Sequence, residues 1–281
     1  MNAVPARVCF NFAAKCNMRC PYCYIPFDGR EAGVEVWKAV VDRVASWGSR
    51  AMTFGGGDPF LYGPFRELLV HAKNHGFFIQ VDTNALLMKD DDYDLTAKHV
   101  DLLGLPLDGS TPELHGAMRR HKKHFHTIVA ALQNSRARNI PIKINTVVSS
   151  LNVGDLLNIA ELLRLHKIER WALYEFWPLG QIALDNALQY NISKESFLRE
   201  TDKLREIVDF ATLEIGSISV RHNSYFFVTH TGKAYTVNPN NHSEYVDLGS
   251  IFDEQVLKIW NEYANPALNT ARLEPRIRTS T

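Results

Sequence analysis

The sequence predicts an α/β fold in which parallel strands alternate with helices. Six short apolar runs have the length and composition of buried strands: residues 8–12, 51–54, 77–82, 101–105, 142–148 and 170–176. Amphipathic helical patterns separate them, for example at residues 34–46, 64–74, 126–138 and 153–165. Strands that alternate with helices pair in parallel through right-handed crossovers. The 281 residues are enough to bury one large core of this kind.

The last third of the chain has a less regular pattern. Residues 194–213 look helical, and residues 218–221, 225–229 and 234–237 look like short strands. Residues 246–249 lead into a last helix through Trp260, and we expect the basic, polar tail after Leu268 to be loosely ordered. We divide the chain into a core, residues 1–180, and a C-terminal extension, residues 181–281, that closes the substrate side of the core.

Composition argues against several classes of protein. The formal net charge of +0 disfavours a nucleic-acid-binding protein held by bulk electrostatics. Of the four cysteines only Cys9 lies outside one motif, so no disulfide framework is expected and a reducing compartment is indicated. There is no signal-peptide pattern and no uninterrupted apolar run of about 18 residues. We therefore expect a cytoplasmic protein without a membrane or nucleic-acid partner.

The strongest chemical signal is a cysteine motif that follows the first predicted strand. Cys16, Cys20 and Cys23 have the spacing C-x3-C-x-aromatic-C, in which Tyr22 is the aromatic residue. Four cysteines would fill a structural zinc site or a closed iron–sulfur cluster. Three leave one iron of a cubane cluster without a protein ligand. The alternatives are a three-cysteine zinc site completed by a histidine, and three cysteines without a metal.

This spacing resembles the cluster motif of the radical S-adenosylmethionine (SAM) superfamily. The resemblance implies a [4Fe–4S] cluster held by Cys16, Cys20 and Cys23, with SAM on the open iron. An electron from the cluster would cleave SAM to a 5′-deoxyadenosyl radical, which would abstract a hydrogen atom from the substrate. A reducing partner such as a flavodoxin or a ferredoxin is implied as well. Together with the six strands, the resemblance predicts a partial (βα)6 radical SAM barrel with a C-terminal α/β extension and functional groups at the carboxyl ends of the strands.

The same resemblance places the SAM site at the ends of the next strands. Gly56 and Gly57 end the second strand, where residues without side chains let the backbone approach a ligand. Asp58 stands in place of the family's usual glutamate, and its carboxylate would hold the SAM amino group. The expected SAM ligands are Tyr22, Gly56, Gly57, Asp58, Thr83, Asn84, Asp108 and Arg119.

The sequence departs from the family's pattern next to two of these expected ligands, or leaves a choice between neighbours. After Thr83 and Asn84, Ala85 replaces the glycine that usually follows in the family. Residues 108–119 resemble the family's D-G…H…R segment, whose arginine pairs with the SAM carboxylate. Because a planar guanidinium binds a carboxylate through two hydrogen bonds, Arg119 is our candidate, and Arg120 is the alternative.

A run of histidines and lysines, residues 121–126, precedes the helix predicted at residues 126–138. The default interpretation is a solvated helix start. A metal site is disfavoured because no acidic or thiolate side chain is adjacent. A helix N-terminus that carries lysines is also able to receive phosphate, and this alternative stays open.

The fifth strand carries polar side chains where parallel barrel strands are normally apolar. Alternation places Lys143 and Asn145 on the same face. A lysine and an amide that point together into a barrel favour a polar ligand, unless Lys143 faces water at the strand start. Arg170, which begins the sixth strand, is a second candidate cation.

The second half of the chain resembles the viperin-like nucleotide dehydratases. Residues 143–147, 151–153, 170–171 and 223–227 carry this resemblance. In these enzymes the ribose 4′ hydrogen of a nucleoside triphosphate is removed and the 3′ hydroxyl departs, and a further electron and proton give a 3′-deoxy-3′,4′-didehydro nucleotide. The resemblance implies that Arg50, Lys143 and Arg170 bind phosphates, Asn145 orients the nucleotide and Tyr225 lies near the ribose. Lys143 and Tyr225 are the catalytic candidates, and a role in antiviral defence is implied.

Two departures from that family weaken the expectation of a triphosphate. Ala172 stands where the family has a phosphate-binding lysine, and residues 238–241 lack the family's basic run. Phosphate charge buried without a cation costs several kcal/mol. One alternative is a radical SAM enzyme that acts on another nucleoside, sugar or small metabolite, and another is a non-catalytic metal-binding or scaffold protein. Peptide modification is disfavoured because cysteines for additional clusters are absent.

Overall fold

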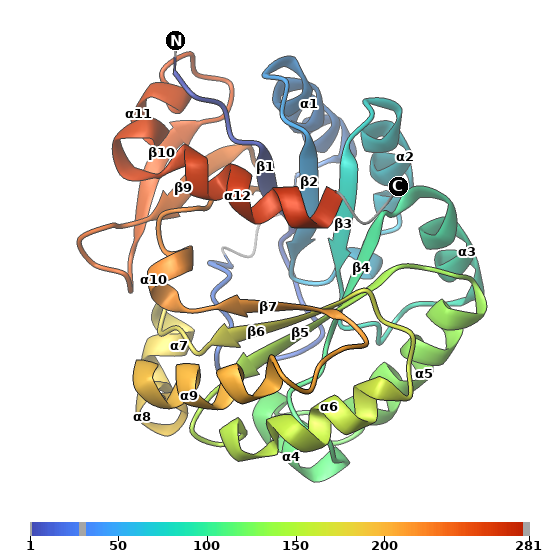
Figure 1. Cartoon of the computed structure of the whole chain (residues 1–281). Helices are drawn as coiled ribbons and strands as arrows, with labels where there is room; N and C mark the ends of the chain where they lie inside the picture. The colour runs from blue at the N-terminus through green and yellow to red at the C-terminus, as the bar shows by residue number, and fades with distance from the viewer. Residues whose placement is uncertain (1, 28–31, 278–281) are drawn as a thin grey trace.

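The computed structural model describes residues 2–27 and 32–277. Its strands form one ten-stranded sheet in the order β10-β9-β8-β1-β2-β3-β4-β5-β6-β7, which curls into an open barrel (Figure 1). Neighbouring strands are parallel from β8 through β1 to β7, and β9 and β10 add an antiparallel edge. The strands are β1 Arg7–Ala13, β2 Ala51–Gly56, β3 Phe78–Asp82, β4 Leu102–Pro106, β5 Ile142–Val148, β6 Arg170–Glu175, β7 Thr212–Gly216, β8 Phe227–Thr229, β9 Lys233–Val237 and β10 Tyr245–Ser250.

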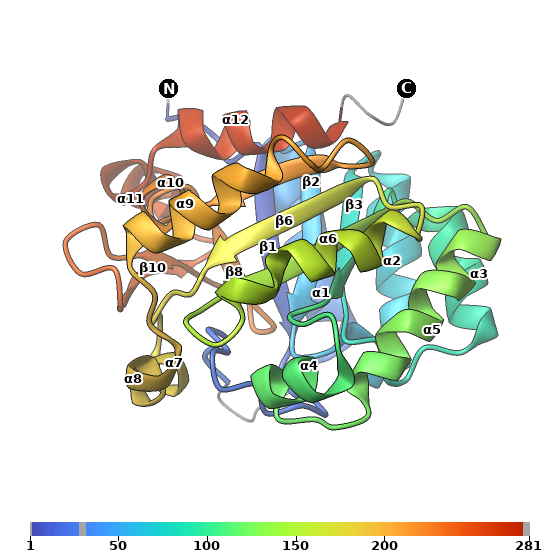
Figure 2. The same ribbon diagram turned by 60° about the horizontal axis from the view of Figure 1, so that its bottom comes forward.

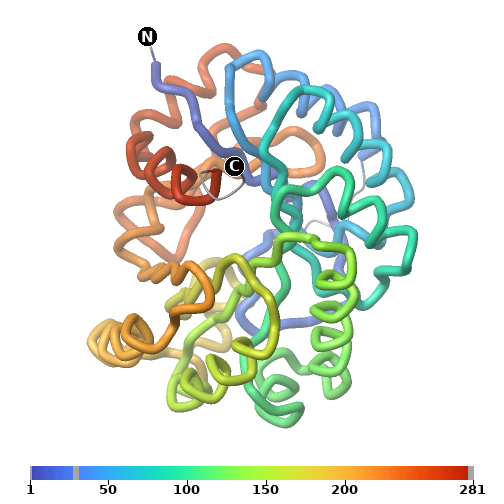
Figure 3. Tube along the Cα trace, turned by 45° about the vertical axis from the view of Figure 1, so that its right-hand side comes forward, coloured from blue at the N-terminus to red at the C-terminus, as the bar shows by residue number. Residues whose placement is uncertain are grey.

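Helices cover the outer face of the barrel (Figure 2), and Figure 3 shows how the strand–helix units follow one another around it. The longer helices are α1 Val34–Ser46, α2 Phe65–Asn74, α3 Asp90–His99, α4 Pro112–Arg119, α5 His124–Ala137, α6 Leu156–Arg164, α9 Lys194–Leu204, α11 Val256–Tyr263 and α12 Pro266–Ile277. The shorter ones are η1 Pro59–Leu61, η2 Val153–Asp155, α7 Gln181–Asp185, α8 Ala187–Tyr190 and α10 Ile218–Arg221. No helix in the described part of the chain is both long enough and apolar enough to cross a membrane.

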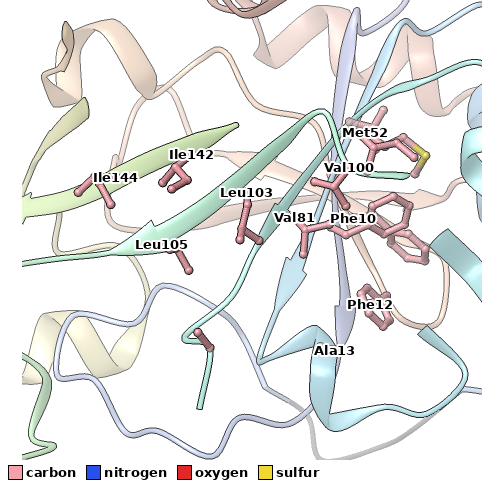
Figure 4. Packing of buried hydrophobic residues seen from close by; sticks show 14 of the residues in the cluster. Phe10, Phe12, Ala13, Met52, Val81, Val100, Leu103, Leu105, Ile142 and Ile144 are labelled. Carbon is pink, nitrogen blue, oxygen red and sulfur yellow. The ribbon is translucent and has the colours of Figure 1, made fainter. Parts of the chain in front are cut away.

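Alternation along each strand separates the hydrophobic core from the barrel interior. On β1, Phe10 and Phe12 are fully buried beneath the helices, and Phe12 stacks on Phe65 of α2 with ring centroids 5.2 Å apart. Figure 4 shows Phe10 and Phe12 in this layer. Arg7 and Cys9, on the other face of β1, line an interior cavity. The core therefore uses one face of each strand, and the other face remains for polar groups that meet a ligand.

Most predicted elements are confirmed. All six predicted strands exist, with ends that differ by one or two residues, and the predicted helices at residues 34–46, 64–74, 126–138 and 153–165 lie where expected, the last beginning as η2. The predicted helix at residues 194–213 was wrong at its end, because α9 stops at Leu204 and β7 pairs in parallel with β6. Strands that follow residue 180 extend both edges of the sheet, with β7 beside β6 and with β8, β9 and β10 beyond β1.

The strand predicted at residues 218–221 was wrong, because these residues form the short helix α10. Glu175, at the end of β6, holds both ends of that helix. Its carboxylate accepts a hydrogen bond from Ile218 N at 2.7 Å, and its carbonyl oxygen accepts one from Arg221 Nη2 at 2.6 Å. A run this short takes its conformation from such tertiary contacts rather than from its own pattern.

The prediction of a loosely ordered tail was also wrong for residues 266–277, which form α12. Residues 278–281 of that tail lie outside the described residues. Helix α12 crosses the N-terminal ends of the strands (Figures 1 and 2). Asn269 exchanges two hydrogen bonds of 3.0 Å with the backbone of Arg7, and Glu274 forms an ion pair of 2.6 Å with Arg50, just before β2. This helix therefore closes the end of the barrel opposite the cysteine loop.

Candidate active site

A cavity of about 290 Å³ lies inside the barrel, near the lower end of the volumes typical of sites for small organic ligands. Of the predicted site residues, it is lined by Cys16, Cys20, Tyr22, Cys23, Gly56, Gly57, Thr83, Asn84, Arg119, Asn145 and Tyr225. The predicted residues that do not line it in the described part of the chain are Arg50, Asp58, Asp108, Lys143 and Arg170. The cavity thus brings together cysteines from the β1 loop and polar side chains from several other strands.

The sulfurs of the three motif cysteines are not arranged as in a preformed site for a single zinc ion. A tetrahedral zinc with Zn–S bonds of about 2.3 Å holds its sulfurs about 3.8 Å apart. Among the described residues, the one set of three potential metal ligands within 4.8 Å of one another is Asp42, His71 and His75, on the outer helices α1 and α2. The three cysteine sulfurs therefore do not all lie within 4.8 Å of one another, and at least one pair is farther apart than a tetrahedral zinc holds its sulfurs.

Two side chains donate hydrogen bonds to these sulfurs. Asn84 Nδ2 lies 3.7 Å from Cys16 Sγ, and Arg119 Nη1 lies 3.7 Å from Cys20 Sγ. Donors to cluster sulfurs tune the reduction potential of an iron–sulfur centre. Burial raises the pKa of each motif thiol, that of Cys23 to about 12, and a cationic centre bound by the three cysteines would hold them as thiolates. The donor set fits a [4Fe–4S] cluster with one open iron.

The glycine segment is required by close packing against the cysteine loop. A Cβ on Gly57 would lie 1.7 Å from Lys15 O, and a Cβ on Gly56, whose φ is +105°, would lie 2.6 Å from Ala13 O. Backbone of the β2 end therefore forms a wall of the cavity that no side chain could occupy.

Asp58, the next residue, turns its carboxylate away from the cavity into the protein. It is fully buried and accepts hydrogen bonds from Phe60 N at 3.0 Å, Thr83 Oγ1 at 2.8 Å and Asn84 N at 2.8 Å. The predicted ligand of the SAM amino group is thus engaged by the chain itself. Its position couples the β2 end to Thr83 and Asn84 at the β3 end.

Arg119 is held in the cavity wall by a buried carboxylate. Its Nε donates to Asp108 Oδ2 at 2.5 Å, and Tyr22 OH donates to the same oxygen at 2.6 Å. Asp108 Oδ1 accepts from Val147 N at 2.7 Å. Arg120 instead donates to Asn186 at 2.8 Å and does not line the cavity. Of the two candidate arginines, the structure brings Arg119 into the site.

A buried histidine pair connects these two strand ends. Asp108 N donates to His115 Nδ1 at 3.1 Å, His115 Nε2 lies 2.8 Å from His124 Nδ1, and His124 Nε2 lies 2.9 Å from Asn84 O. Because His115 Nδ1 accepts, its Nε2 donates to His124, which in turn donates to the carbonyl. Burial, and then the charge of Arg119, lower the pKa of both histidines to about 3, which keeps them neutral.

The expectation of a solvated helix start at residues 121–126 was therefore wrong for His124, which is fully buried. Lys122, Lys123 and His126 are exposed, as expected. The adjacent lysines concealed His124, because sequence alone does not show which histidine of such a run turns inward.

The predicted phosphate ligands on β5 and β6 are buried in an ion-pair network. Lys143 is fully buried, so it does not face water, and its Nζ lies 3.2 Å from Glu214 and 2.9 Å from Tyr174 OH. Arg170 lies 3.5 Å from the same Glu214 and donates to the carbonyl of Pro275 in α12. Both cations thus contact groups of the chain itself, at the end of the barrel that α12 covers.

Asp82, Asn145 and Tyr225, from three different parts of the chain, also line the cavity. Asn145 Nδ2 lies 3.3 Å from Asp82 Oδ1, and Asn145 Oδ1 is buried without a hydrogen-bond partner. A Cβ on Gly104 would lie 1.9 Å from Asp82 Oδ1, so glycine makes room for this pair. Burial raises the pKa of Tyr225, but the charges of nearby arginines outweigh burial and lower it to about 8.

Sequence reasoning missed three arginines that line the cavity, Arg7, Arg221 and Arg272. Arg7 precedes the first apolar run, and Arg221 lies in the segment that was predicted as a strand. For Arg272 a signal existed, since Leu273 and Ile277 are spaced as on one face of a helix, but Pro275 between them argued against one.

Comparison with known proteins gives matches along most of the barrel. Residues 10–163 match the sequence profile of the radical SAM superfamily. The Fe-coproporphyrin III synthase of Methanosarcina barkeri is 30% identical over 156 residues, which are 53% of this chain and 38% of that protein. The S-adenosylmethionine-dependent nucleotide dehydratase of Selenomonas ruminantium is 30% identical over 163 residues, 53% of this chain and 58% of that protein. The matched part of the chain thus spans less than two thirds of the length of each of these relatives.

Solved structures share the fold at low sequence identity. Streptococcus suis SuiB bound to its precursor peptide SuiA superposes with a TM-score of 0.71 and 14% identity, over 96% of this chain and 67% of that chain. The structure of anSMEcpe with bound AdoMet and the Kp18Cys peptide has a TM-score of 0.71 and 18% identity, over 96% of this chain and 83% of that chain. At these identities the likeness establishes the fold alone.

Proposed function

Because this chain belongs to the radical SAM superfamily, whose cofactors are a [4Fe–4S] cluster and SAM, we propose that it is a nucleotide dehydratase of the viperin-like kind. When bound, the two cofactors supply a 5′-deoxyadenosyl radical, which abstracts one hydrogen atom from the substrate. The protein binds, orients and encloses the reactants, and these tasks decide which hydrogen is removed.

We assign the cofactors to the end of the cavity that carries the cysteines. Cys16, Cys20 and Cys23 hold the cluster, with Asn84 and Arg119 as donors to its sulfurs. The outer edge of the Arg119 guanidinium, which carries the two Nη atoms, remains for the SAM carboxylate, because Asp108 occupies its Nε. The backbone at Gly56 and Gly57 and the side chains of Tyr22 and Thr83 complete the SAM wall.

Asp58 and Asp108 act as positioning residues in this proposal. Each is fully buried and already accepts several hydrogen bonds from the chain. Asp58 fixes Thr83 and Asn84, and Asp108 fixes Arg119 and Tyr22. Ligand groups held in this way need little reorganisation when SAM binds.

The ribose of the substrate occupies the middle of the cavity. Among the described residues, Asn145 Oδ1 has no hydrogen-bond partner and Asp82 forms no ion pair, although its Oδ1 accepts from Gln80 and Asn145. Asn145 Oδ1 and the Asp82 carboxylate are therefore acceptors for ribose hydroxyls. Tyr225, whose pKa is lowered to about 8 against the effect of burial, is a suitable proton donor to the departing 3′ hydroxyl near neutral pH. Loss of a hydrogen atom and hydroxide, followed by uptake of one electron, converts the nucleotide to its didehydro product, and one proton converts the hydroxide to water.

The observation that carries the proposal is the continuity of one cavity from the three cysteines to Asn145 and Tyr225. The relative named as a nucleotide dehydratase supports the same reading. The test is anaerobic incubation of reconstituted enzyme with SAM, a reductant and a panel of nucleosides and nucleotides. Stimulation of 5′-deoxyadenosine by one nucleotide, with a product lighter by one water, supports dehydration. Equal 5′-deoxyadenosine with every nucleotide and with none contradicts it.

A second candidate, a radical SAM enzyme that acts on another small metabolite, is favoured by one specific observation. Lys143 and Arg170, where the viperin-like enzymes would bind phosphates, both contact Glu214. A substrate without phosphates would leave this network undisturbed. The same panel separates the two candidates, because only the dehydratase depends on the phosphorylation state of a nucleotide.

A further inference from the structure

Three arginine side chains converge on Tyr225 in the cavity. Arg7 begins β1, Arg221 ends α10 and Arg272 lies on α12, and all three line the cavity. The cysteine loop follows the other end of β1, and the seven residues of this strand span roughly 20 Å. Arg7 and Arg272 thus mark the arginine end of the cavity, opposite the cysteine end. Arg221 extends toward the same tyrosine from the carboxyl end of β6, where it donates to Glu175 O.

None of these three guanidinium groups has a carboxylate partner within the described part of the chain. Arg119, by contrast, forms a 2.5 Å ion pair with Asp108. Arg7 and Arg221 are only 5% and 7% exposed, and the Nε atom of each is buried without a hydrogen-bond partner. A buried cation without a counter-ion is costly. Two such buried cations and the half-buried Arg272 around one cavity indicate that a ligand supplies the negative charge.

Neutral groups orient these arginines without neutralising them. Arg272 donates to Tyr225 OH at 3.1 Å, and its guanidinium lies 4.7 Å from the centre of the Tyr225 ring. The guanidinium of Arg221 lies 5.0 Å from the ring centres of both Tyr174 and Trp177. Such cation–π contacts fix the plane of a guanidinium group. Arg221 also donates to Glu175 O and Arg272 to Ser224 Oγ, but these acceptors are neutral, and each guanidinium has further N–H donors for an oxyanion.

We propose that Arg7, Arg221 and Arg272 bind the phosphate groups of the substrate. This inference rests on the proposed nucleotide dehydratase and specifies which part of the cavity receives the phosphates. Planar guanidinium groups suit phosphate oxygens, which they bind in pairs. The ribose then lies between the arginine end and the cysteine end, beside Asn145 and Tyr225.

The cations at the family's phosphate positions are neutralised within the chain. Glu214 lies 3.2 Å from Lys143, 3.5 Å from Arg170 and 2.8 Å from Arg276. Burial raises the pKa of Glu214, but these three cations lower it to well below its ordinary value. A phosphate at Lys143 has to displace Glu214 from these ion pairs, whereas a phosphate at Arg7 and Arg272 meets cations without a counter-ion. In this proposal the phosphate site of the chain therefore lies on β1, α10 and α12, and not on β5 and β6 as the resemblance to the viperin-like enzymes implies.

The test is calorimetric titration of the anaerobically reconstituted enzyme with SAM present. Pyrophosphate probes the anion site alone, and a nucleoside compared with its monophosphate and triphosphate gives the contribution of the phosphates. Arg7→Gln and Arg272→Gln are each expected to weaken pyrophosphate and nucleotide binding roughly 10- to 100-fold. The affinity for the nucleoside is expected to stay unchanged.

Arg276→Gln is the matched control, because it removes the same charge from α12 one turn further along, where Glu214 is the partner. Its pyrophosphate affinity is expected to equal that of the wild type. Lys143→Gln is expected to behave in the same way. Wild-type affinity in Arg7→Gln and Arg272→Gln, together with a loss in Lys143→Gln, overturns the proposal.

Stability separates loss of a ligand contact from loss of the fold. Removal of an unpaired buried charge is expected to raise the unfolding temperature of the phosphate-free enzyme, and Arg7→Gln is expected to lose the further increase that pyrophosphate gives the wild type. An unfolding temperature below that of the wild type without phosphate overturns the assignment of Arg7. Arginine-dependent binding of pyrophosphate without any nucleotide-stimulated 5′-deoxyadenosine leaves the anion site standing and rejects nucleotide dehydration. Arginine-dependent binding of citrate but not of pyrophosphate overturns the phosphate assignment.

Discussion

His115 Nε2 lies 2.8 Å from His124 Nδ1, in a chain of hydrogen bonds that runs from the Asp108 amide to the Asn84 carbonyl. Both rings are fully buried, and burial is the main cause of their pKa of about 3. The pair holds the β3 and β4 strand ends at a fixed separation, and these ends carry Asn84 and the carboxylate that orients Arg119. The stability of the site is therefore linked to the protonation of two groups that do not contact the cavity directly.

This linkage predicts a specific loss of stability in mild acid. The unfolded chain binds protons at His115 and His124 below about pH 6.5, but the folded protein binds them only near pH 3. The contribution of the two histidines to the free energy of unfolding is therefore fully present above pH 6.5. It falls as the pH drops toward 3, by about 1.4 kcal/mol per pH unit for each histidine. Urea unfolding at a series of pH values measures this slope.

His124→Gln tests the assignment, and His126→Gln, at an exposed position on the same helix, is its control. The first substitution is expected to halve the histidine contribution to the slope, and the second to leave the slope unchanged. Identical slopes in the wild type and in His124→Gln contradict the assignment.

Arg119 and Arg120 are predicted to differ in SAM binding. Arg119→Gln removes the guanidinium that lines the cavity and is expected to weaken SAM binding roughly 10- to 100-fold. Arg120→Gln removes an exposed contact with Asn186 and is expected to bind SAM normally. Equilibrium binding of SAM measures both, with iron content determined in parallel because Arg119 also lies 3.7 Å from Cys20 Sγ. Normal SAM affinity in Arg119→Gln at full iron content would exclude the predicted role.

Gly104→Ala is predicted to damage the substrate site and to spare the cluster. The added Cβ would lie 1.9 Å from Asp82 Oδ1 and 3.0 Å from Asn145 Nδ2, so this pair has to move. Substrate-stimulated 5′-deoxyadenosine is expected to be lost, while iron content and visible absorbance remain those of the wild type. Gly63→Ala is the control, because a Cβ there meets no atom within 4 Å. Undiminished stimulation in Gly104→Ala would show that this wall of the cavity is not used.

Ala85→Gly is predicted to stabilise the protein. Ala85 has a φ of +60°, in the left-handed region that costs an L-residue roughly 1–2 kcal/mol. Glycine relieves this strain, so the unfolding temperature is expected to rise by roughly 2–4 °C. Ala130→Gly, at an exposed position inside α5, is expected to lower stability by about 1 kcal/mol. A fall in stability for Ala85→Gly would contradict the strain.

The sequence was sufficient for the parts of the site that come from strand ends. In a parallel barrel all carboxyl ends of the strands meet at one rim, so Cys16, Gly56, Asn84 and Arg119 had to come together once the strands were identified. The same reasoning placed Lys143 and Asn145 on the inner face of β5, because side chains alternate along a strand.

The sequence was not sufficient for side chains whose role depends on distant partners. Glu214 neutralises Lys143 and Arg170 from β7, a strand that was not predicted and whose first two residues were predicted as the end of a helix. Arg272 reaches the cavity through a helix that was predicted as a loose tail. His124 is buried because α5 packs against α4, where the His124 ring stacks on that of His115 with centroids 5.0 Å apart. In each case packing between elements far apart in the chain decides the outcome, and local pattern carries no information about it.

The central claim is that the three cysteines support cleavage of SAM and that the resulting radical reacts with a nucleotide bound in the cavity behind them. Its most direct measurement is mass spectrometry of an anaerobic reaction of reconstituted enzyme with SAM, reductant and a nucleotide, run beside Cys20→Ala. The account predicts 5′-deoxyadenosine and a nucleotide product lighter by one water with the wild type, and neither with Cys20→Ala. Intact SAM with the wild type, or the same products with Cys20→Ala, would contradict it.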